Sequence, residues 1–372
     1  MAMYLSSDLV EEIFKRVPAR SLERLRHTCK QWNTLIKDPR FVNKHMSHMH
    51  GREEQFTVFN DVSTVSPSLC STISCVGMNF NDEPRLNFQV FKPLPSSDLL
   101  VRSVFHCDGL LLMDMRTKLL VSNPLLKQAR WIKCGSNPEF DHPMDAYGLG
   151  YVSNGSRSCN DYKMVKFRCT EDIRAEVYDF KSDCWKVVVV VKNYIGFSGL
   201  PVSSVCLRGT PYWIGYNRYL NRTVSIQSFD FSKERFEPLF KFLHHSSIGP
   251  IQWQDSLSLG IFRGDHLSLL HEPRLKGRIH IWVMREKDWS KLMTVAIPQL
   301  HKFPKYPSYF IENNGKLVLS VRHFVTRAIS IYVVGENQEC QKFECYSSME
   351  PSIGGSGCYY VPSLLLVPGF SS

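Results

Sequence analysis

A repeat of about fifty residues runs through most of this chain and restricts the fold more than any other feature. Each unit begins with a turn residue followed by a strand of alternating apolar residues. The steps between successive turn residues are 52, 48, 55 and 51 residues, counted through Gly109, Asp161, Gly209, Gly264 and Gly315. A regular period of this length indicates an array of equal units, because each unit buries its apolar face against its neighbours.

A pair of strands follows in each unit, and its second strand opens with a large aromatic residue. These aromatics lie 54, 51, 53 and 54 residues apart, at Trp131, Trp185, Phe236, Trp289 and Phe343. In the three central units another aromatic stands seven residues earlier, which gives the pairs Tyr178 with Trp185, Phe229 with Phe236, and Trp282 with Trp289. This spacing predicts two strands joined by a tight turn, with both aromatics in one packed layer.

Four strands in about fifty residues is the size of one β-propeller blade. Five units lie between about residues 101 and 346, and the β-rich stretch 55–100 is long enough for another. Residues 359–366 can supply a strand that closes the ring with this first stretch. The sequence therefore predicts an all-β, propeller-like domain of six blades over residues 55–372. The even period argues against the alternative, a pair of stacked sheets.

The unit around Trp185 gives two further expectations. We expect Trp185 to be a buried core residue, whose truncation to Ala would cost about 3–5 kcal/mol. The run Val187–Val191 is apolar at every position. We therefore expect this strand to be covered on both faces by neighbouring blades.

The first forty residues have a different character and predict an all-α unit of three short helices. Leu5, Leu9, Ile13 and Val17 fall four apart and form one apolar stripe on the first helix. Pro18 ends that helix, because it has no N–H to donate. A unit this small buries little surface, so its stripe needs a partner. That partner is either the rest of the chain, with the unit as a helical cap, or another protein.

Capping residues and prolines set the expected boundaries of these helices. Ser7 is expected to cap the first helix and Ser21 the second. The third helix ends at Asp38-Pro39 and is lined by Cys29, Trp32, Leu35 and Ile36. The polar stretch that follows contains Gly51 and reads as a linker. The predicted division is a helical domain over residues 1–45, a linker over 46–54 and the β domain over 55–372.

The order of residues in the helical domain resembles the F-box. The resemblance rests on Asp8-Leu9-Val10-x-x-Ile13, Val17-Pro18-x-x-Ser21-Leu22-x-x-Leu25-Arg26, Cys29-Lys30-x-Trp32-x-x-Leu35-Ile36 and Asp38-Pro39-x-Phe41. The chain departs from the family at Ser6, where Pro is usual, and this change can loosen the start of the first helix. The resemblance implies docking to a Skp-type adaptor and, through it, to the cullin scaffold of a ubiquitin ligase. The residues it assigns to adaptor binding are Leu5, Leu9, Ile13, Val17, Pro18, Leu22, Leu25 and Trp32.

The β domain resembles the F-box-associated domain of the large plant F-box family, whose members are often labelled F-box/kelch proteins. The motifs are Leu119 to Pro124 before Arg130-Trp131, Tyr147 to Tyr151, Val177 to Phe180 before Trp185, and Phe229 to Phe231 before Arg235-Phe236. The Gly-Gly doublets of true kelch blades are missing, apart from Gly354-Gly355 near the C-terminus. The domain is therefore kelch-like in its period but not in this signature.

Composition narrows the class of protein and its partners. The chain has 45 Lys and Arg against 35 Asp and Glu, a net charge of +10, without a run of five or six basic residues. This predicts no nucleic-acid tract and a mild preference for acidic partners. No apolar run approaches the roughly 18 residues of a membrane helix, and acidic residues stand where a signal peptide would have its apolar core. We therefore expect an intracellular protein of the nucleus or cytoplasm with no membrane partner.

The search for catalytic and metal-binding motifs finds none, so no catalytic, cofactor-binding or metal-binding residue is predicted. The twelve Cys show no C-x-x-C spacing and read as reduced, with Cys169 and Cys184 in the core. His45, His48 and His50 could hold a metal, but no further ligand completes a site, and a solvated linker is the preferred interpretation. His271-Glu272 lacks a second His, and Gly354 to Gly357 opens no helix. Asp179 and Asp230 recur at one blade position, which indicates turn carboxylates rather than a catalytic pair.

Two classes of function remain. The first is a non-catalytic subunit of a ubiquitin ligase that binds a target protein through the β domain, while the helices dock the adaptor. The second is a propeller enzyme or small-ligand-binding module with an incidental helical cap, because propeller active sites come from scattered loop residues. Co-purification with a Skp-type adaptor would separate the classes, but the target cannot be read from loop sequences.

Overall fold

The computed structural model describes the helical domain, most strands of the β domain and the C-terminal segment. The described residues are 6–50, 52, 55–65, 68–79, 85–91, 101–115, 118–135, 145–153, 160–169, 175–188, 201, 203–217, 223–241, 251–252, 254–274, 277–286, 288–297, 307–322, 329–335, 337–345 and 358–369. None of the helices in this part of the chain is long and apolar enough to cross a membrane.

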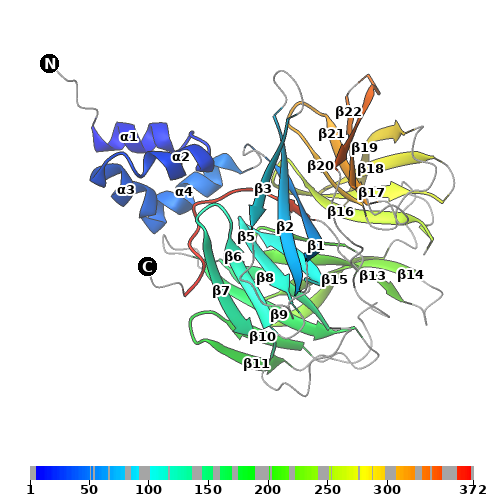
Figure 1. The fold of residues 1–372 in the computed structure, drawn as a ribbon. Coiled ribbons are helices and arrows are strands. Elements are labelled where there is room, and N and C mark those ends of the chain that lie inside the picture. Colours follow the sequence, from blue (N-terminus) through cyan, green and yellow to red (C-terminus); the bar gives the residue numbers. More distant parts are fainter. Residues whose placement is uncertain are drawn as a thin grey trace.

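The described residues before the β domain form four helices, one more than the sequence predicts (Figure 1). They are α1 (Ser7–Phe14), α2 (Ala19–Leu25), α3 (Lys30–Lys37) and α4 (Pro39–Met49). Asp38 ends α3 as expected, but its carboxylate then accepts a hydrogen bond from Arg40 N at 2.8 Å and caps a new helix. Pro39 occupies the first position of that helix, where a missing N–H costs nothing. Residues 46–49 thus lie in α4, although the sequence assigns them to a linker.

Two expected caps are also wrong. The N-cap of α1 is Ser6 rather than Ser7, and its Oγ accepts from Leu9 N at 3.4 Å. α2 begins after Pro18 without a side-chain cap, so Ser21 lies inside the helix. Cys29 is the N-cap of α3, where its Sγ accepts from Trp32 N at 3.5 Å.

The β domain is a propeller in which five sheets each consist of four consecutive strands. These are β4 (Ser103–Cys107), β5 (Leu110–Asp114), β6 (Lys118–Asn123), β7 (Gln128–Lys133); β8 (Asp145–Val152), β9 (Asp161–Arg168), β10 (Ala175–Asp179), β11 (Cys184–Val188); β12 (Ser204–Leu207), β13 (Thr210–Asn217), β14 (Thr223–Asp230), β15 (Arg235–Lys241); β16 (Ser256–Phe262), β17 (His266–Glu272), β18 (Arg278–Arg285), β19 (Asp288–Ala296); and β20 (Ser308–Ile311), β21 (Leu317–Arg322), β22 (Ile329–Val334), β23 (Cys340–Cys345). Among the described residues, five blades consist of consecutive strands, so the prediction of six such blades is wrong in its count.

A further four-stranded sheet is composite, in the order β24-β1-β2-β3. Its strands are β1 (Phe56–Val65), β2 (Ser68–Asn79), β3 (Arg85–Phe91) and, from the C-terminal end, β24 (Cys358–Tyr360). Phe56 pairs with Tyr360 and Val58 with Cys358 in an antiparallel register. The expected closing strand is thus present, although it is shorter than predicted.

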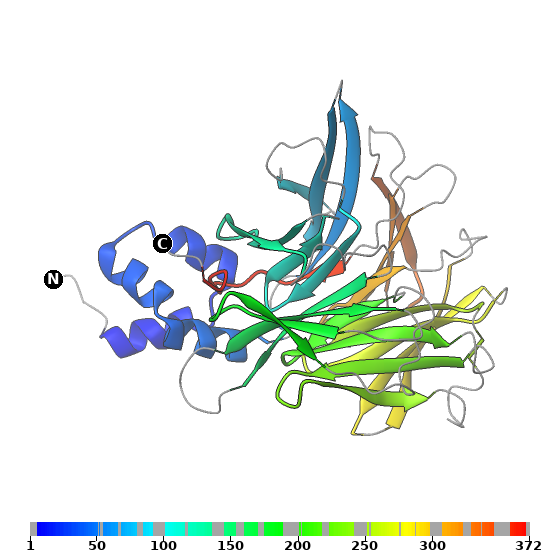
Figure 2. The same ribbon diagram turned by 90° about the horizontal axis from the view of Figure 1, so that it is seen from below.

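The first strands of the sheets lie around a common centre (Figures 1 and 2). β4 contacts β8, β8 contacts β12, β12 contacts β16, and β16 contacts β20. β24 contacts both β20 and β4, and β4 also meets β12. The core fills the spaces between successive sheets, where the apolar side chains of neighbouring strands interlock.

Tight turns join the first two strands of several sheets and use the backbone conformation that glycine favours. Asp108 and Gly109 have φ values of 51° and 81°, and Arg208 and Gly209 have φ values of 50° and 78°. Two successive positive φ values are typical of the two-residue turn that fits a twisted hairpin. Gly264 and Gly315 also have positive φ, so four of the five recurring turn residues share this structural cause, whereas Asp161 is the first residue of β9.

The paired aromatics follow the predicted register in two of the three central units. Tyr178 lies opposite Trp185 and Phe229 opposite Phe236, with ring centroids 5.2 and 5.0 Å apart. Trp282 instead faces Lys291, because the register shifts between Ile281 and Trp282. One extra residue in the ladder moves later side chains out of the expected pairing.

The strand that contains Trp185 lies at the outer edge of its sheet instead of in the core of the propeller. β11 is the outermost strand of its sheet, and Val187 is 63% exposed. Trp185 is half-buried, and its Nε1 donates to Lys133 O at 3.0 Å. Cys184 is exposed, contrary to expectation, whereas Cys169 is buried. Residues 189–191 lie outside the described residues.

The C-terminal segment, residues 361–369, runs from β24 along the β4–β7 sheet towards the helices (Figures 1 and 2). Asn123 is fully buried and holds it, because Nδ2 donates to Ser363 O at 3.0 Å and to Leu365 O at 2.7 Å. Arg130 Nη1 donates to Pro368 O at 2.8 Å, and Val367 N donates to Gln128 Oε1 at 3.1 Å. Leu364 continues into the apolar core of the helical domain. The segment therefore joins the two domains.

A polar cluster lies inside the β16–β19 sheet, at the ends of β16 and β17 remote from their shared turn. Asp255 accepts hydrogen bonds from His271 Nε2 at 2.9 Å and from Arg274 N at 3.1 Å. Burial disfavours the charge of Asp255, but these bonds outweigh it and lower its pKa. Glu272 is also buried, and burial together with the charge of Asp255 raises the pKa of Glu272 to about 7.

We expect Asn123→Ala to lower the free energy of unfolding by about 2–4 kcal/mol, because two carbonyls of the C-terminal segment and Leu126 N lose their buried partner. Chemical denaturation of the full chain measures this change. Asn337→Ala is the control, because Asn337 is exposed and should shift stability by less than about 0.5 kcal/mol. Equal midpoints for the two variants would show that Asn123 does not hold the segment.

We expect Glu272→Gln to change how stability depends on pH. Below the ordinary Glu pKa of 4.5, Glu272 is protonated in both the folded and the unfolded chain, so its burial adds no charge penalty. Its folded pKa of about 7 makes the native protein lose stability as pH rises from about 4.5 to about 7. The variant should therefore match the native protein at pH 4 and exceed it by about 2–3 kcal/mol at pH 8. Denaturation series at both pH values test this, and a stability difference independent of pH would contradict it.

Candidate adaptor-binding surface

The helical domain has a small apolar core shared with the β domain. Each helix contributes one buried side to this core, and Leu126 and Leu364 from the β domain complete the cluster. The buried helical residues are Val10, Phe14, Ala19, Leu22, Ile36, Phe41 and Val42. Burying apolar area in this way contributes roughly 25 cal/mol per Å². The helices therefore pack as a layer on the β domain rather than standing apart from it.

Two residues of the predicted stripe, Leu9 and Ile13, lie outside this core, whereas Val17 packs against it. Leu9 is 53% exposed and Ile13 is 48% exposed, whereas Val10 and Phe14 face inward. Residues four apart share one face of a helix, so Leu9 and Ile13 form a continuous apolar patch. Large apolar residues exposed together on a helix indicate a surface that another protein covers.

The other residues assigned to adaptor binding differ in accessibility. Pro18 is exposed at the start of α2, and Val17, Leu25 and Trp32 are half-buried. Trp32 packs edge-on against Phe14 with ring centroids 5.0 Å apart, so part of its surface supports α1. Leu22 is fully buried and stabilises the helical core instead of lining the surface. Leu5 lies outside the described residues.

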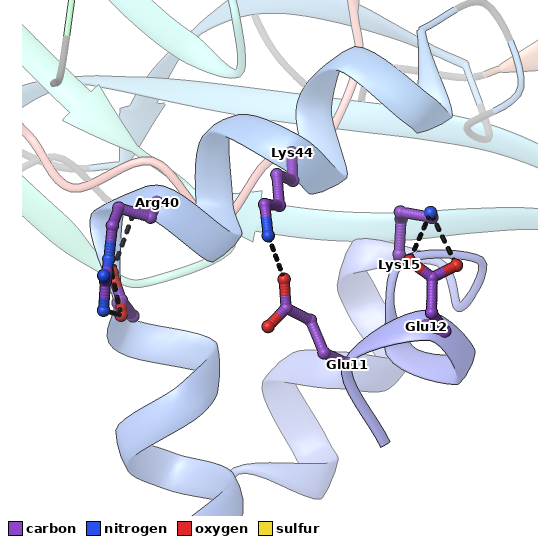
Figure 3. A network of polar contacts seen from close by, with 6 residues as sticks. Glu11, Glu12, Lys15, Arg40 and Lys44 are labelled. Atoms are coloured by element: carbon purple, nitrogen blue, oxygen red, sulfur yellow. Dashed lines mark hydrogen bonds and ion pairs between the residues drawn. The ribbon is translucent and has the colours of Figure 1, made fainter. Parts of the chain in front are cut away.

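Charged side chains form ion pairs within and between the helices (Figure 3). Lys44 Nζ on α4 lies 2.5 Å from Glu11 Oε1 on α1, which links the first helix to the last. Lys15 Nζ lies 2.7 Å from Glu12 Oε2, and this hydrogen bond lowers the pKa of Glu12. Exposed ion pairs of this kind add little to stability, because water screens the two charges.

His45 is a buried structural residue, although its sequence context predicts a solvated linker. It is buried on α4, and its ring Nε2 bonds to Val17 O at 2.8 Å, with the ring N–H as donor. Burial lowers the pKa of His45. The bond ties α4 to the loop between α1 and α2. Among the described residues, no group of three His, Cys, Asp or Glu side chains is arranged to hold a metal ion.

A cavity of about 80 Å³ lies between α4 and the centre of the β domain. Met46 and Met49 line it from α4, and the turn residues Asp108 and Arg208 line it from the β domain. His106 and Tyr359 also line it. His106 Nε2 accepts from Gly109 N at 2.9 Å, and burial lowers the pKa of His106 to about 4. Tyr162 Oη donates to Asp108 Oδ2 at 2.9 Å, so both polar groups support the turn.

The recurring aspartates serve the turns, as the sequence predicts. Asp179 Oδ1 accepts from Lys181 N at 2.7 Å. Asp230 Oδ1 accepts from Ser232 N at 2.8 Å and Lys233 N at 3.1 Å. Burial opposes the charge of Asp230, but these hydrogen bonds outweigh it and lower its pKa to about 2.

Each of the two domains matches a known protein family. Residues 4–44 match the family model of the F-box domain, and residues 64–367 match that of the F-box associated beta propeller domain. A putative F-box protein of Arabidopsis thaliana is 31% identical over 99% of this chain and 95% of its own length. An F-box/WD-40 repeat-containing protein of the same plant is 31% identical over 98% of this chain and 89% of its own.

A further plant relative and one solved structure are also similar to this chain. A putative F-box/kelch-repeat protein of Arabidopsis thaliana is 31% identical over 97% of this chain and 96% of its own length. The solved structure of TolB from Acinetobacter baumannii gives a TM-score of 0.45 at 11% identity, covering 82% of this chain and 66% of TolB. The two domain matches and the full-length plant relatives agree: this chain belongs to the F-box proteins that carry an F-box associated β-propeller domain.

Proposed function

We propose that this protein is the substrate-recognition subunit of an SCF-type ubiquitin ligase. The F-box docks a Skp-type adaptor and through it the cullin scaffold, and the propeller binds a target protein. The observation that carries the proposal is the apolar patch of Leu9 and Ile13, exposed on a helix of an F-box domain. Such a receptor works in the nucleus or cytoplasm together with the rest of the ligase.

In this role the protein catalyses no covalent step of its own. It would raise the effective concentration of a target lysine beside a charged ubiquitin-conjugating enzyme, and such positioning accelerates a reaction by itself. Positioning requires that the two binding surfaces keep a fixed relation. The shared core of Leu126 and Leu364 with the helices, and the bonds of Asn123, supply a rigid connection of this kind.

We also infer that the composite sheet acts as the sixth blade of the ring. The support is its inner strand β24, which contacts β20 on one side and β4 on the other. A closed ring leaves no inner sheet edge open for pairing with other chains. Closure also joins the beginning of the β domain to its end, which fits one folding unit rather than an open array.

The position of α4 restricts the part of the propeller surface on which a target can bind. α4 lines the cavity at one end of the propeller axis, next to the Asp108 and Arg208 turns. A protein target could enter the axis from that end only by displacing α4. We therefore place the target on the remaining loops and on the outer strands.

A small-ligand-binding module with a helical cap stays as the alternative, and the cavity beneath α4 is the observation that favours it. Co-purification of the full chain with a Skp-type adaptor separates the two. A chain that never binds an adaptor would favour the alternative. Affinity purification after proteasome inhibition would then identify the target of the leading proposal.

The double substitution Leu9→Ala with Ile13→Ala should weaken adaptor binding at least tenfold, because truncated anchor residues at the centre of an interface lose the most binding energy. The melting temperature of the free chain should stay unchanged, since both side chains are exposed. Calorimetric titration with purified adaptor gives the affinity.

Val187→Ala is the matched control for this test, because Val187 is an exposed apolar residue on β11, outside the helical domain. It should bind the adaptor normally. Leu22→Ala is the contrasting variant, which should lose binding together with the folded helical core. Normal binding by the Leu9 and Ile13 double variant would remove α1 from the interface.

Ser6→Pro should leave adaptor binding equal or make it tighter. Ser6 has φ of −63°, which proline adopts without strain, and a fixed φ favours the start of the helix. The same titration measures the effect. A clear loss of affinity would show that the hydrogen bond from Leu9 N to Ser6 Oγ matters more than the fixed backbone.

A further inference from the structure

Two buried thiols from different blades meet at the centre of the propeller. Cys107 ends β4 and Cys206 lies in β12, and the residues are 99 apart in the sequence. Their Sγ atoms lie 2.9 Å apart, and the side chains are 0% and 7% exposed. β4 and β12 belong to sheets separated by the β8–β11 sheet, yet the two strands are in contact.

We propose that Cys107 and Cys206 are a redox site that forms a reversible disulfide across the centre of the β domain. A disulfide bond is about 2.03–2.05 Å long, so a movement of about 1 Å would bring the sulfurs from their present separation to bonding distance. The strands that carry the two residues are in contact, which holds their backbones close together. In the part of the chain that the structure describes, this is the pair of cysteines whose thiols meet.

The cavity beneath α4 gives a small oxidant access to the pair. Cys206 lines this cavity together with Arg208 and Asp108, whereas Cys107 lies behind it. A cavity of about 80 Å³ admits molecules of the size of water or hydrogen peroxide. Cys206 is therefore the thiol that a small oxidant in the cavity meets first.

The oxidant class that completes the reaction is a peroxide. The Cys206 thiolate attacks one oxygen of hydrogen peroxide, which gives a sulfenic acid and water once the leaving hydroxide takes a proton. The Cys107 sulfur then attacks the sulfenic sulfur, the S–S bond forms and a second water leaves. In total the two thiols lose two protons and two electrons, and one peroxide is reduced to two waters. A dithiol reductant reverses the bond by thiol–disulfide exchange.

The surroundings of the pair make this a slow reaction. Burial raises the pKa of both thiols, and the nearby charge of Asp108 adds to the effect. The reactive thiolate is therefore scarce at neutral pH. Exposed Cys29 and Cys184 should react sooner, but neither lies beside a second described thiol.

A bond between these residues would fix the inner rim next to α4. Cys107 directly precedes the Asp108-Gly109 turn, and Cys206 stands two residues before Arg208. Both turns line the cavity that α4 covers. The bond would also close a long loop, which restricts the unfolded chain and stabilises the folded one. Oxidation would thus stiffen the junction of the two domains.

The test uses the reduced full chain, treated with hydrogen peroxide over a time course, alkylated and digested with trypsin without reduction. Residues 103–116 and 193–208 form two tryptic peptides that each contain one cysteine. The expected result is a mass equal to the two peptides joined, which disappears after dithiothreitol. Oxidised protein should melt about 5 °C higher than reduced protein.

Variants separate the pair from general oxidation. Cys206→Ala should abolish the joined peptide and the melting shift, and Cys169→Ala should keep both, because Cys169 is an equally buried cysteine without a thiol partner in the described structure. If Cys206→Ala does not fold, alkylation of the native chain before and after oxidation still reports both thiols. Full oxidation of Cys29 and Cys184 while Cys107 and Cys206 remain free thiols would overturn the proposal. So would linkage of either residue to a different cysteine.

Discussion

The pairing of β24 with β1 is the constraint on which the rest of the structure depends. It brings residues 358–360 next to residues 56–58, from opposite ends of the β domain. β1 begins shortly after α4 ends, and the C-terminal segment begins where β24 ends. Closing the sheet therefore places both ends of the β domain beside the helices. This single pairing puts Leu364 in the core of the helical domain and Ser363 within reach of Asn123.

The joint between the domains follows from that arrangement. Leu126 from the β6–β7 turn and Leu364 from the C-terminal segment enter one apolar cluster with Phe41 and Val42 of α4. Apolar burial has no preferred direction, so it would permit the helices to slide. The three hydrogen bonds of Asn123 are directional and buried, and they hold the β6–β7 turn and the C-terminal segment together, so that Leu126 and Leu364 meet the helices from one fixed surface. Adhesion and orientation are thus divided between two kinds of interaction.

The sequence predicts the period, the strand content and the closing strand, because these depend on local patterns that repeat. It misses features that depend on neighbouring units. The bulge between Ile281 and Trp282 shifts one register without any local signal, and the apolar run that includes Val187 lies on an outer edge rather than in the core. On α1, Leu9 and Ile13 share one face of the helix, as their four-residue spacing predicts. Spacing alone does not tell which of two apolar faces turns inward, and Val10 with Phe14 forms the buried one.

α4 shows most clearly why part of the site could not be predicted. Its sequence, PRFVNKHMSHM, has the polar composition of a linker. The buried positions are Phe41, Val42, His45 and Met49, which recur at helical spacing once His45 is counted as apolar. A histidine can occupy a buried position when its ring N–H has an acceptor, and Val17 O in the loop between α1 and α2 is that acceptor. Because that acceptor is set by the tertiary fold, the helix can be recognised as the cover of the propeller centre only when both domains are seen together.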